Sequence, residues 1–306
     1  MATPDMRFDG RVCVITGAGG GLGRSHALEL ARRGAKVVVN DLGGSVDGSG
    51  ASSSAAERVV EEIRAAGGEA VANRDTVATP EGGEAIVAAA LDAFGRIDVL
   101  VNNAGILRDK AFHKMDAAMI DAVVDVHLKG ALYVSQPAFR YMRAQGYGRI
   151  VNTSSASGLF GNFGQANYGA AKAGLAGLTR VLALEGAGHD IKVNAIAPIA
   201  ATRMTEDLLG ELHSRVSPET VSPAVAFLAS DQCSVNGHVY SVAGGRIARI
   251  MVVETQGVVL EDNTAEAVRD HIAAVDLADA QPYHEPTSLD EETTIIAKAL
   301  AEAAGS

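Results

Sequence analysis

The stretch Thr16-Gly17-Ala18-Gly19-Gly20-Gly21-Leu22-Gly23 decides the fold, and it directly follows the apolar run 12–16. It matches Thr-Gly-x-x-x-Gly-x-Gly, but it does not fit G-x-G-x-x-G in any register. Glycines between a strand and a helix let the backbone approach a pyrophosphate, which the free N–H groups of the helix N-terminus can bind. The alternative is a plain tight strand–helix turn. The stretch predicts dinucleotide binding by Gly17, Gly21, Leu22 and Gly23.

Short runs rich in Val and Ile alternate with Ala-rich stretches of helical period from Arg11 to about Val242. We expect strands at 12–16, 36–40, 70–74, 99–102, 149–153, 192–196 and 239–242, and helices at 23–33, 55–66, 84–94, 118–145 and 167–185. This alternation predicts the α/β class: one Rossmann-like, doubly wound parallel sheet with helices on both faces. Ligands of such sheets bind outside the carboxyl ends of the strands.

Two segments depart from this alternation. Residues 42–54 are rich in Gly and Ser, and they form either a surface insertion or a flap over the cofactor. Beyond Gly245 an apolar run, a Gln-Gly turn and an acidic helical stretch follow. We expect residues 1–245 to form the dinucleotide-binding domain and residues 246–306 to form a C-terminal extension packed on the core. That extension either covers a substrate tunnel or binds a neighbouring subunit.

Composition narrows the class of partner. The 306 residues are 47% hydrophobic and carry a formal net charge of −11, without a Lys/Arg-rich run. Nucleic acid and anionic membranes are therefore not expected as partners, because phosphate binding needs a positive surface. Cys13 and Cys233 lie far apart and form no metal-binding spacing, so we expect neither a disulfide nor a metal site. No signal peptide or membrane-spanning apolar run is present in this sequence, which predicts a cytoplasmic location.

The second expected strand ends in Asn40-Asp41, which places an acid where ribose-binding carboxylates occur. A carboxylate there accepts from both ribose hydroxyls and repels a 2′-phosphate. An arginine or lysine at position 20 or 42 could bind that phosphate, but this chain has the uncharged residues Gly20 and Leu42 there. The sequence therefore favours NAD over NADP. Asp75, after the third strand, either bonds the adenine amine or caps a helix.

An acid–base pattern lies between residues 155 and 172. Tyr168 precedes Lys172 by four residues, and Ser155 precedes Tyr168 by thirteen. Residues four apart share one face of a helix, so the Lys172 ammonium can favour the Tyr168 phenolate. The Ser155 hydroxyl then holds the substrate oxygen as its charge changes. This arrangement suits the interconversion of an alcohol and a ketone.

With Asn102-Asn103-Ala104-Gly105 after the fourth strand, these ordered motifs resemble the short-chain dehydrogenase/reductase family from Arg11 to about Gly245. The resemblance implies that Tyr168 is the general acid/base and that Lys172 is its pKa partner and a ligand of the nicotinamide ribose. It also implies that Ser155 holds the substrate oxygen. Further cofactor contacts implied by the family are Asp41, Asp75, Thr76, Asn103, Ala104, Gly105, Pro198 and Tyr168 itself.

One position departs from the family pattern. Where many members have Val-Asn-Leu-x-Gly, this chain has Val126-His127-Leu128-Lys129-Gly130. His127 either preserves a proton relay in altered form or is a core histidine satisfied by a carbonyl. Pro198-Ile199 also replaces the Pro-Gly found in many members.

Within the family, Val-His-Leu-Lys-Gly and the run Gly161-Asn162-Phe163-Gly164-Gln165-Ala166-Asn167-Tyr168 resemble one branch. That branch is the (3R)-hydroxyacyl-CoA dehydrogenase portion of peroxisomal multifunctional β-oxidation enzymes, also known as a 17β-hydroxysteroid dehydrogenase. The resemblance implies NAD-dependent oxidation of a (3R)-3-hydroxyacyl-CoA. It also implies a homodimer or homotetramer paired through helices 118–145 and 167–185.

Three alternatives stay open from the sequence. The substrate is instead a hydroxysteroid, or the reaction is the reduction of a 3-oxoacyl thioester, or the chain is a non-catalytic nucleotide-sensing module. Arg108, Lys110 and Arg203 either meet the phosphates of coenzyme A or are solvated surface charges.

Overall fold

A computed structural model describes residues 5–50, 54–202, 215–275 and 283–304. The chain divides into two compact units, Met1–Arg249 and Ile250–Ser306. The first unit contains all the motifs discussed above. Arg203 lies outside the described residues, so its expected phosphate contact has no structural account.

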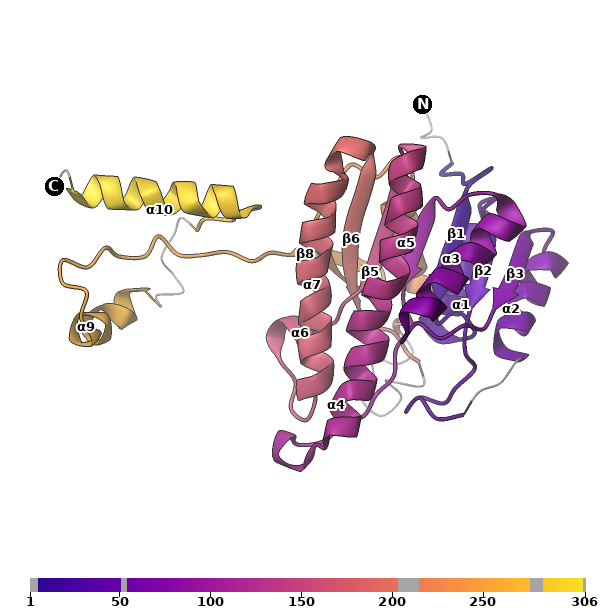
Figure 1. The fold of residues 1–306 in the computed structure, drawn as a ribbon, viewed down its shortest axis with the longest axis horizontal. Helices are drawn as coiled ribbons and strands as arrows, with labels where there is room; N and C mark the ends of the chain where they lie inside the picture. Colours follow the sequence, from indigo (N-terminus) through magenta and orange to yellow (C-terminus); the bar gives the residue numbers. More distant parts are fainter. Residues whose placement is uncertain (1–4, 51–53, 203–214, 276–282, 305–306) are drawn as a thin grey trace. The chain divides into compact units, whose positions relative to one another are not determined.

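The first unit is built on a sheet whose strands run in the order β3-β2-β1-β4-β5-β6-β7-β8 (Figure 1). Their bounds are β1 Val12–Thr16, β2 Lys36–Asn40, β3 Glu69–Asn73, β4 Val99–Asn102, β5 Gly148–Thr153, β6 Ile191–Pro198, β7 Val239–Ala243 and β8 Arg246–Ile250. Strands β1 to β7 pair in parallel, with β1 between β2 and β4. The chain therefore reverses its direction of travel across the sheet between β1 and β4, which is where such sheets bind ligands.

β8 joins β7 through Gly244 and Gly245, whose φ angles are 54° and 85°. Two residues of positive φ suit a tight hairpin, and a parallel strand would need a much longer connection. β8 lies beyond residue 245, the expected end of the dinucleotide-binding domain.

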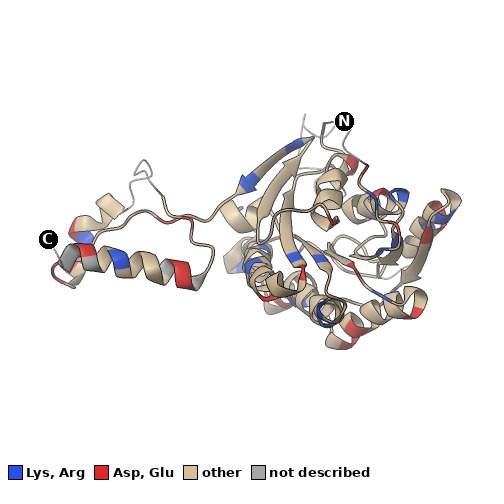
Figure 2. Cartoon of the chain, turned by 90° about the horizontal axis from the view of Figure 1, so that it is seen from above, with Lys and Arg blue, Asp and Glu red and all other residues tan. Residues whose placement is uncertain are grey.

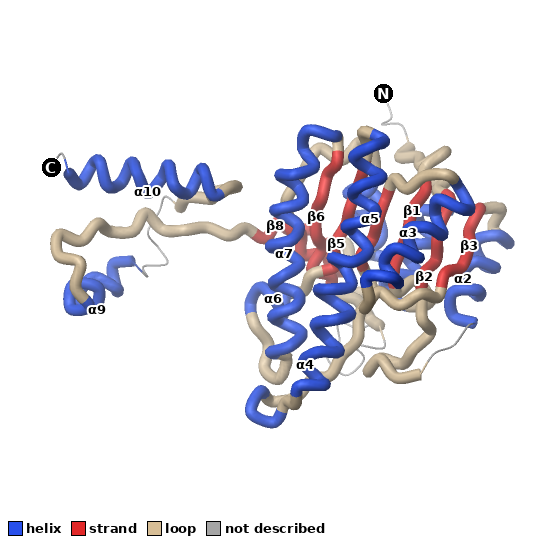
Figure 3. The backbone as a smooth tube through the Cα atoms, viewed as in Figure 1, coloured by secondary structure: helices blue, strands red, loops and turns tan. Residues whose placement is uncertain are grey.

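Helices cover both faces of the sheet (Figure 3). Their bounds are α1 Gly21–Arg32, α2 Ser54–Ala65, α3 Pro80–Phe94, α4 Ala117–Val124, α5 Gly130–Gln145, α6 Ala156–Phe160, α7 Ala166–Gly186 and α8 Ser222–Ala229. Helices α1, α2 and α8 pack on one face, and α3, α5 and α7 pack on the other. The predicted doubly wound α/β fold is confirmed.

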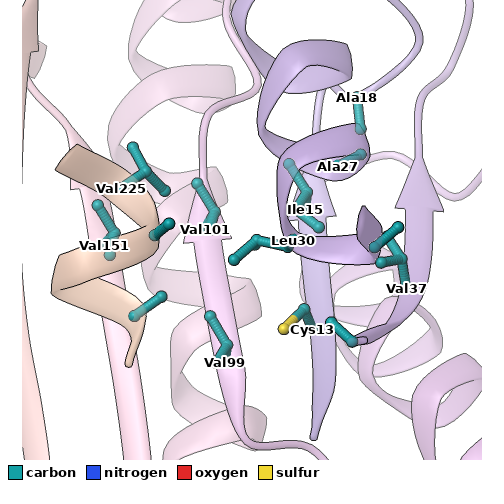
Figure 4. Close-up of a cluster of buried hydrophobic side chains, with 14 of the residues drawn as sticks. Cys13, Ile15, Ala18, Ala27, Leu30, Val37, Val99, Val101, Val151 and Val225 are labelled. Atoms are coloured by element: carbon teal, nitrogen blue, oxygen red, sulfur yellow. The ribbon is translucent and has the colours of Figure 1, made fainter. Parts of the chain in front are cut away.

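Alternate residues of each strand enter opposite cores, because successive side chains of a strand point to opposite faces. In β1, Cys13 and Ile15 pack with Leu30 of α1, while Val12 and Val14 enter the other core. Figure 4 shows the first of these clusters between the strands and their helices. Burying one such aliphatic side chain contributes about 1.5–3 kcal/mol.

The helix expected over residues 118–145 is not continuous. A π-helical turn, η2 (Asp125–Lys129), separates α4 from α5. The spacing of apolar residues in the sequence does not reveal one π-helical turn, because residues before and after it follow the same α-helical pattern. π-turns occur often at functional sites, and this one carries His127, which is buried.

The second unit contains α9 (Ala265–Val275) and α10 (Leu289–Ala304), with an isolated antiparallel bridge between Glu254 and His284. α9 exposes Val268 and Ile272. The expectation that residues 246–306 pack on the core, and the role of this extension, stay predictions.

The surfaces of α5 and α7 expose large apolar side chains, namely Leu132, Tyr141, Val181 and Leu184. The expected pairing of subunits through these helices stays a prediction.

Lys and Arg are interspersed with Asp and Glu over the helices (Figure 2). Among the described residues, no helix combines the length and apolar character needed to cross a bilayer.

Candidate active site

The carboxyl ends of the central strands open into a cavity of about 750 Å³. Residues from every motif recognised in the sequence line this cavity. The predicted site residues in its wall are Gly17, Gly21, Leu22, Asp41, Asp75, Thr76, Asn103, Ala104, Gly105, His127, Ser155, Tyr168, Lys172 and Pro198. Motifs more than 150 residues apart in the chain therefore meet at one site.

The glycine stretch forms a close-packed turn at one end of the cavity. Gly17 has a φ of +64°, and a Cβ there would lie 2.7 Å from the Cα of Ala104. Gly23 packs beneath this turn, since its Cβ would lie 2.2 Å from the Gly17 carbonyl oxygen. No side chain caps the N-terminus of α1 at Gly20. The turn therefore presents backbone and an uncapped helix end to the cavity, which fits a pyrophosphate.

Asp41 stands at the end of β2, and its carboxylate is oriented by two backbone donors. Gly19 N–H donates to Oδ2 at 2.7 Å, and Gly43 N–H donates to Oδ1 at 2.6 Å. Each carboxylate oxygen retains a further lone pair, so the group can still accept from ribose hydroxyls. The residues of this half of the cavity thus fit the adenosine half of a dinucleotide.

Asp75 does not cap a helix. Thr79 is the N-cap of α3, where its side chain accepts from Gly82 N–H at 3.1 Å. The Asp75 carboxylate instead accepts from the Asn73 side chain at 2.7 Å, and its backbone oxygen accepts from Asn40 at 2.9 Å. The capping alternative is wrong, and the adenine contact stays a prediction.

Asn103 links the ends of β1 and β4. Its amide donates to the carbonyl oxygens of Thr16 at 2.9 Å and Gly17 at 3.0 Å. The Thr16 hydroxyl accepts from the N–H groups of Asn103 and Ala104 at 3.0 and 3.1 Å. These bonds hold the glycine turn against β4 and so support the cofactor site, as the family resemblance implies.

The Gly/Ser loop after β2 borders the cavity over part of its length. Leu42, Gly44, Ser45, Val46 and Gly48 all line it. The loop is tied across the cavity to the segment after β4 by two bonds. Leu107 N–H donates to Val46 O at 2.9 Å, and Arg108 Nε donates to Asp47 O at 3.0 Å. The loop therefore forms part of the cavity wall, and its role as a flap over the cofactor stays a prediction.

Ser155, Tyr168 and Lys172 meet at the other end of the cavity. Ser155 is the N-cap of α6, and its hydroxyl accepts from Ser157 N–H at 3.2 Å. The Lys172 ammonium lies 5.5 Å from the centroid of the Tyr168 ring. It donates to Thr153 O at 2.5 Å. The spacing in sequence therefore does bring the three side chains together.

Burial is the largest influence on the pKa values of Tyr168 and Lys172. It raises the pKa of Tyr168, while a hydrogen bond with Ser155 lowers it and the charge of Asp109 raises it further. Burial also lowers the pKa of Lys172 to about 7. Burial therefore acts against the charged form of both groups, the Tyr168 phenolate and the Lys172 ammonium.

His127 projects from the π-turn into the cavity wall, and its ring lies edge-on to Tyr168 with centroids 5.1 Å apart. Nε2 lies 3.0 Å from Ile106 N and 2.8 Å from Ile106 O, and a neutral imidazole nitrogen forms only one of these bonds. Nδ1 is buried and has no partner among the described residues. Burial and the charge of Lys172 lower the pKa of His127 well below its usual value. The contact with the Ile106 backbone fits a core histidine. The unpartnered Nδ1 is also compatible with a proton relay, so both alternatives for His127 stay predictions.

Of the cations considered for coenzyme A, Arg108 is already engaged. Its guanidinium donates to Asp47 O and, at 3.4 Å, to Ala118 O. Lys110 is exposed. Among the described residues, no cluster of three or more His, Cys, Asp or Glu side chains could hold a metal ion.

Several supporting residues were not identified from the sequence. Thr153 offers its carbonyl to Lys172, and Ser154 donates its hydroxyl to Lys172 O at 2.8 Å. Asn167, next to Tyr168, bonds to three backbone groups. The only signal in the sequence is that each of them lies next to a motif residue. Their bonds involve backbone groups, which every residue has, so no residue pattern predicts them.

Comparison with known proteins agrees with this site. The model of the short chain dehydrogenase family matches residues 11–211. A Mycobacterium tuberculosis protein, whose name assigns it to the short-chain type dehydrogenases/reductases, is 56% identical over 81% of this chain and 87% of its own length. The mouse peroxisomal multifunctional enzyme type 2 is 49% identical over 98% of this chain and 41% of its own length.

A solved structure of the full-length peroxisomal multifunctional enzyme type 2 from Drosophila melanogaster is also similar. It matches with a TM-score of 0.81 and 39% identity, over 97% of this chain and 50% of that one. The chain thus spans half or less of the length of these two multifunctional proteins. The fold, the arrangement of the motifs and these likenesses together show that the chain belongs to the short-chain dehydrogenase/reductase family.

Proposed function

We propose that this oxidoreductase is an NAD-dependent dehydrogenase that converts a (3R)-3-hydroxyacyl-CoA to a 3-oxoacyl-CoA. The observation that carries the proposal is the cavity itself. It has the Asp41 carboxylate at the end of β2 and the Ser155, Tyr168 and Lys172 set at the end of β5 and on α7. The likeness to multifunctional enzymes type 2 and the branch-like runs around His127 and Tyr168 support the acyl-CoA substrate.

The proposed reaction divides between cofactor and protein. NAD supplies the two-electron hydride acceptor. The Tyr168 oxygen takes the proton of the substrate hydroxyl as the carbinol C–H bond breaks and the C=O bond forms. The Ser155 hydroxyl donates to the substrate oxygen and holds it during this change. Returning hydride and proton to the ketone reverses both steps.

The raised pKa of Tyr168 gives the reaction a direction-dependent pH profile. Oxidation needs the phenolate, so its rate is expected to rise with pH. Reduction needs the phenol, so its rate is expected to fall as pH rises. Both directions therefore need assays at more than one pH.

The test is a substrate panel with NAD and then NADP. Initial rates are measured on (3R)- and (3S)-hydroxyacyl-CoA, a 17β-hydroxysteroid and, with reduced cofactor, a 3-oxoacyl thioester. We expect NAD-dependent turnover of the (3R) isomer and little of the (3S) isomer. A preference for the steroid, or for NADPH-dependent reduction, would replace the proposed substrate. Tight cofactor binding without turnover of a broad alcohol and ketone panel would favour the nucleotide-sensing alternative.

Asp41→Asn tests the cofactor preference. The change keeps the size and one acceptor oxygen but removes the charge that would meet the ribose and repel a 2′-phosphate. A charge-assisted hydrogen bond contributes about 1.5–3 kcal/mol, so the NAD/NADP ratio of kcat/KM should fall at least about tenfold. Asp75→Asn is the matched control: its expected adenine contact is common to NAD and NADP, so the change should leave the NAD/NADP ratio unaltered even if both cofactors bind less tightly. An unchanged ratio in Asp41→Asn would remove Asp41 from cofactor selection.

A further inference from the structure

Asn167 immediately precedes Tyr168 and is the second residue of α7. Its side chain is buried, with 4% of the residue exposed. The amide donates to the carbonyl oxygens of Arg108 and Met119, each at 3.1 Å. Its own oxygen accepts from the backbone N–H of Tyr168 at 2.8 Å. All three partners are backbone groups, so they fix which end of the amide is the oxygen.

These bonds join three segments that are distant in the chain. Arg108 lies in the segment after β4, Met119 lies in α4, and Tyr168 lies in the first turn of α7. That turn receives no side-chain cap from its N-cap residue, Gln165. The first N–H groups of a helix have no partner within it. Asn167 therefore supplies the missing acceptor and anchors the turn to the wall of the cavity.

We propose that Asn167 is a positioning residue, which holds the Tyr168 hydroxyl at the distance from Ser155 and from the substrate oxygen that proton transfer requires. The inference rests on the proposed oxidoreductase function. A misplacement of about 1 Å at a reacting group can cost roughly 100-fold in rate. Without its two anchors, the first turn of α7 loses its own bonds to Arg108 and Met119. Among the described residues, only the bonds of the preceding Gly164 and Gln165 to Lys110 and Asp109 then hold it to the segment after β4.

Two substitutions separate the anchors from the bond to Tyr168. Asn167→Leu removes all three bonds at similar volume. Asn167→Asp keeps an acceptor for Tyr168 N–H but loses both donations, and its carboxylate faces two carbonyl oxygens. We expect kcat to fall by about 10–100-fold in each, with the dissociation constant for NAD within about twofold of the parent protein. The primary deuterium isotope effect on kcat should rise, because the chemical step becomes slower.

The matched control is an asparagine outside α7 that bonds to the other end of this helix. Asn236 donates to Ala183 O of α7 at 3.0 Å and accepts from Val193 N–H of β6 at 2.8 Å. Asn236→Leu should lower thermal stability but leave kcat per folded protein and the isotope effect unchanged. If Asn167 had only a structural role, its variants would likewise lose thermal stability without a change in kcat per folded protein or in the isotope effect.

A second readout does not depend on turnover. The ¹³Cζ resonance of Tyr168, assigned with Tyr168→Phe, should change in both Asn167 variants and stay in place in Asn236→Leu. Folded Asn167→Asp with the parent kcat, isotope effect and resonance position would overturn the inference. A parent protein that lacks NAD-dependent turnover would overturn the proposed function, while the resonance test would still decide the role of Asn167.

Discussion

Replacing Tyr168 by phenylalanine is expected to reduce turnover by about 100- to 10,000-fold, which is the usual contribution of general acid–base catalysis. The ring that packs edge-on against His127 is retained, and only the hydroxyl is lost. Binding of NAD should change little, since the glycine turn and Asp41 lie at the opposite end of the cavity. Steady-state rates in both directions and a calorimetric titration with NAD give the two measurements.

Tyr141→Phe is the control for this variant. Tyr141 lies on the exposed side of α5, with 43% of the residue accessible. Removal of its hydroxyl should leave the rate unchanged. Retained turnover in Tyr168→Phe would exclude Tyr168 as the acid–base group, and a parallel loss of NAD affinity would show that the hydroxyl serves binding instead.

Replacing Lys172 by methionine should have opposite effects on activity and stability. Turnover is expected to fall by at least about 100-fold, because the ammonium beside the ring favours the deprotonated phenol when it is charged. The folded protein should become more stable at pH 7 by about 4 kcal/mol. The wild-type fold buries a group whose pKa is lowered to about 7, and the variant has no such group.

The sign follows from proton linkage. The unfolded chain holds the Lys172 proton up to its ordinary pKa of 10.5, whereas the folded protein releases it near 7. Burial of this lysine therefore costs most at pH 7 and below, and the cost disappears as pH rises toward 10.5. Denaturant unfolding across this range should show the gap between Lys172→Met and wild type narrowing with pH. Lys110→Met, at an exposed lysine, should show no such trend, and a constant gap would contradict the burial cost.

The order and type of the elements follow from the sequence alone. Alternating Val/Ile-rich runs and Ala-rich stretches require buried parallel strands between helices, and the structure confirms the expected strands of the sheet, in several cases to within one residue at each end. The glycine stretch also predicts the close-packed turn beside the cavity. Only glycine fits at position 23, because a Cβ there would collide with the Gly17 carbonyl oxygen. Spacing of four and thirteen residues likewise identified Lys172 and Ser155 from Tyr168.

The sequence could not reveal the features that depend on burial and on backbone partners. The π-turn at Asp125–Lys129 interrupts a helix whose residues keep their ordinary pattern. The capping role offered for Asp75 belongs to Thr79, because α3 begins at Pro80 and its N-cap is therefore the residue directly before it.

Local composition and spacing thus determined the strand–turn–helix order, the dinucleotide turn and the identity of the acid–base set, because each depends on residues close together in the chain. Tertiary structure alone decided the ionisation of that set, since the pKa values of Tyr168 and Lys172 respond to solvent exclusion by elements distant in sequence. It also decided that the loop after β2 is tied across the cavity and that Asn167 anchors the helix bearing Tyr168. Both depend on carbonyl groups that every residue carries and that only folding brings within reach.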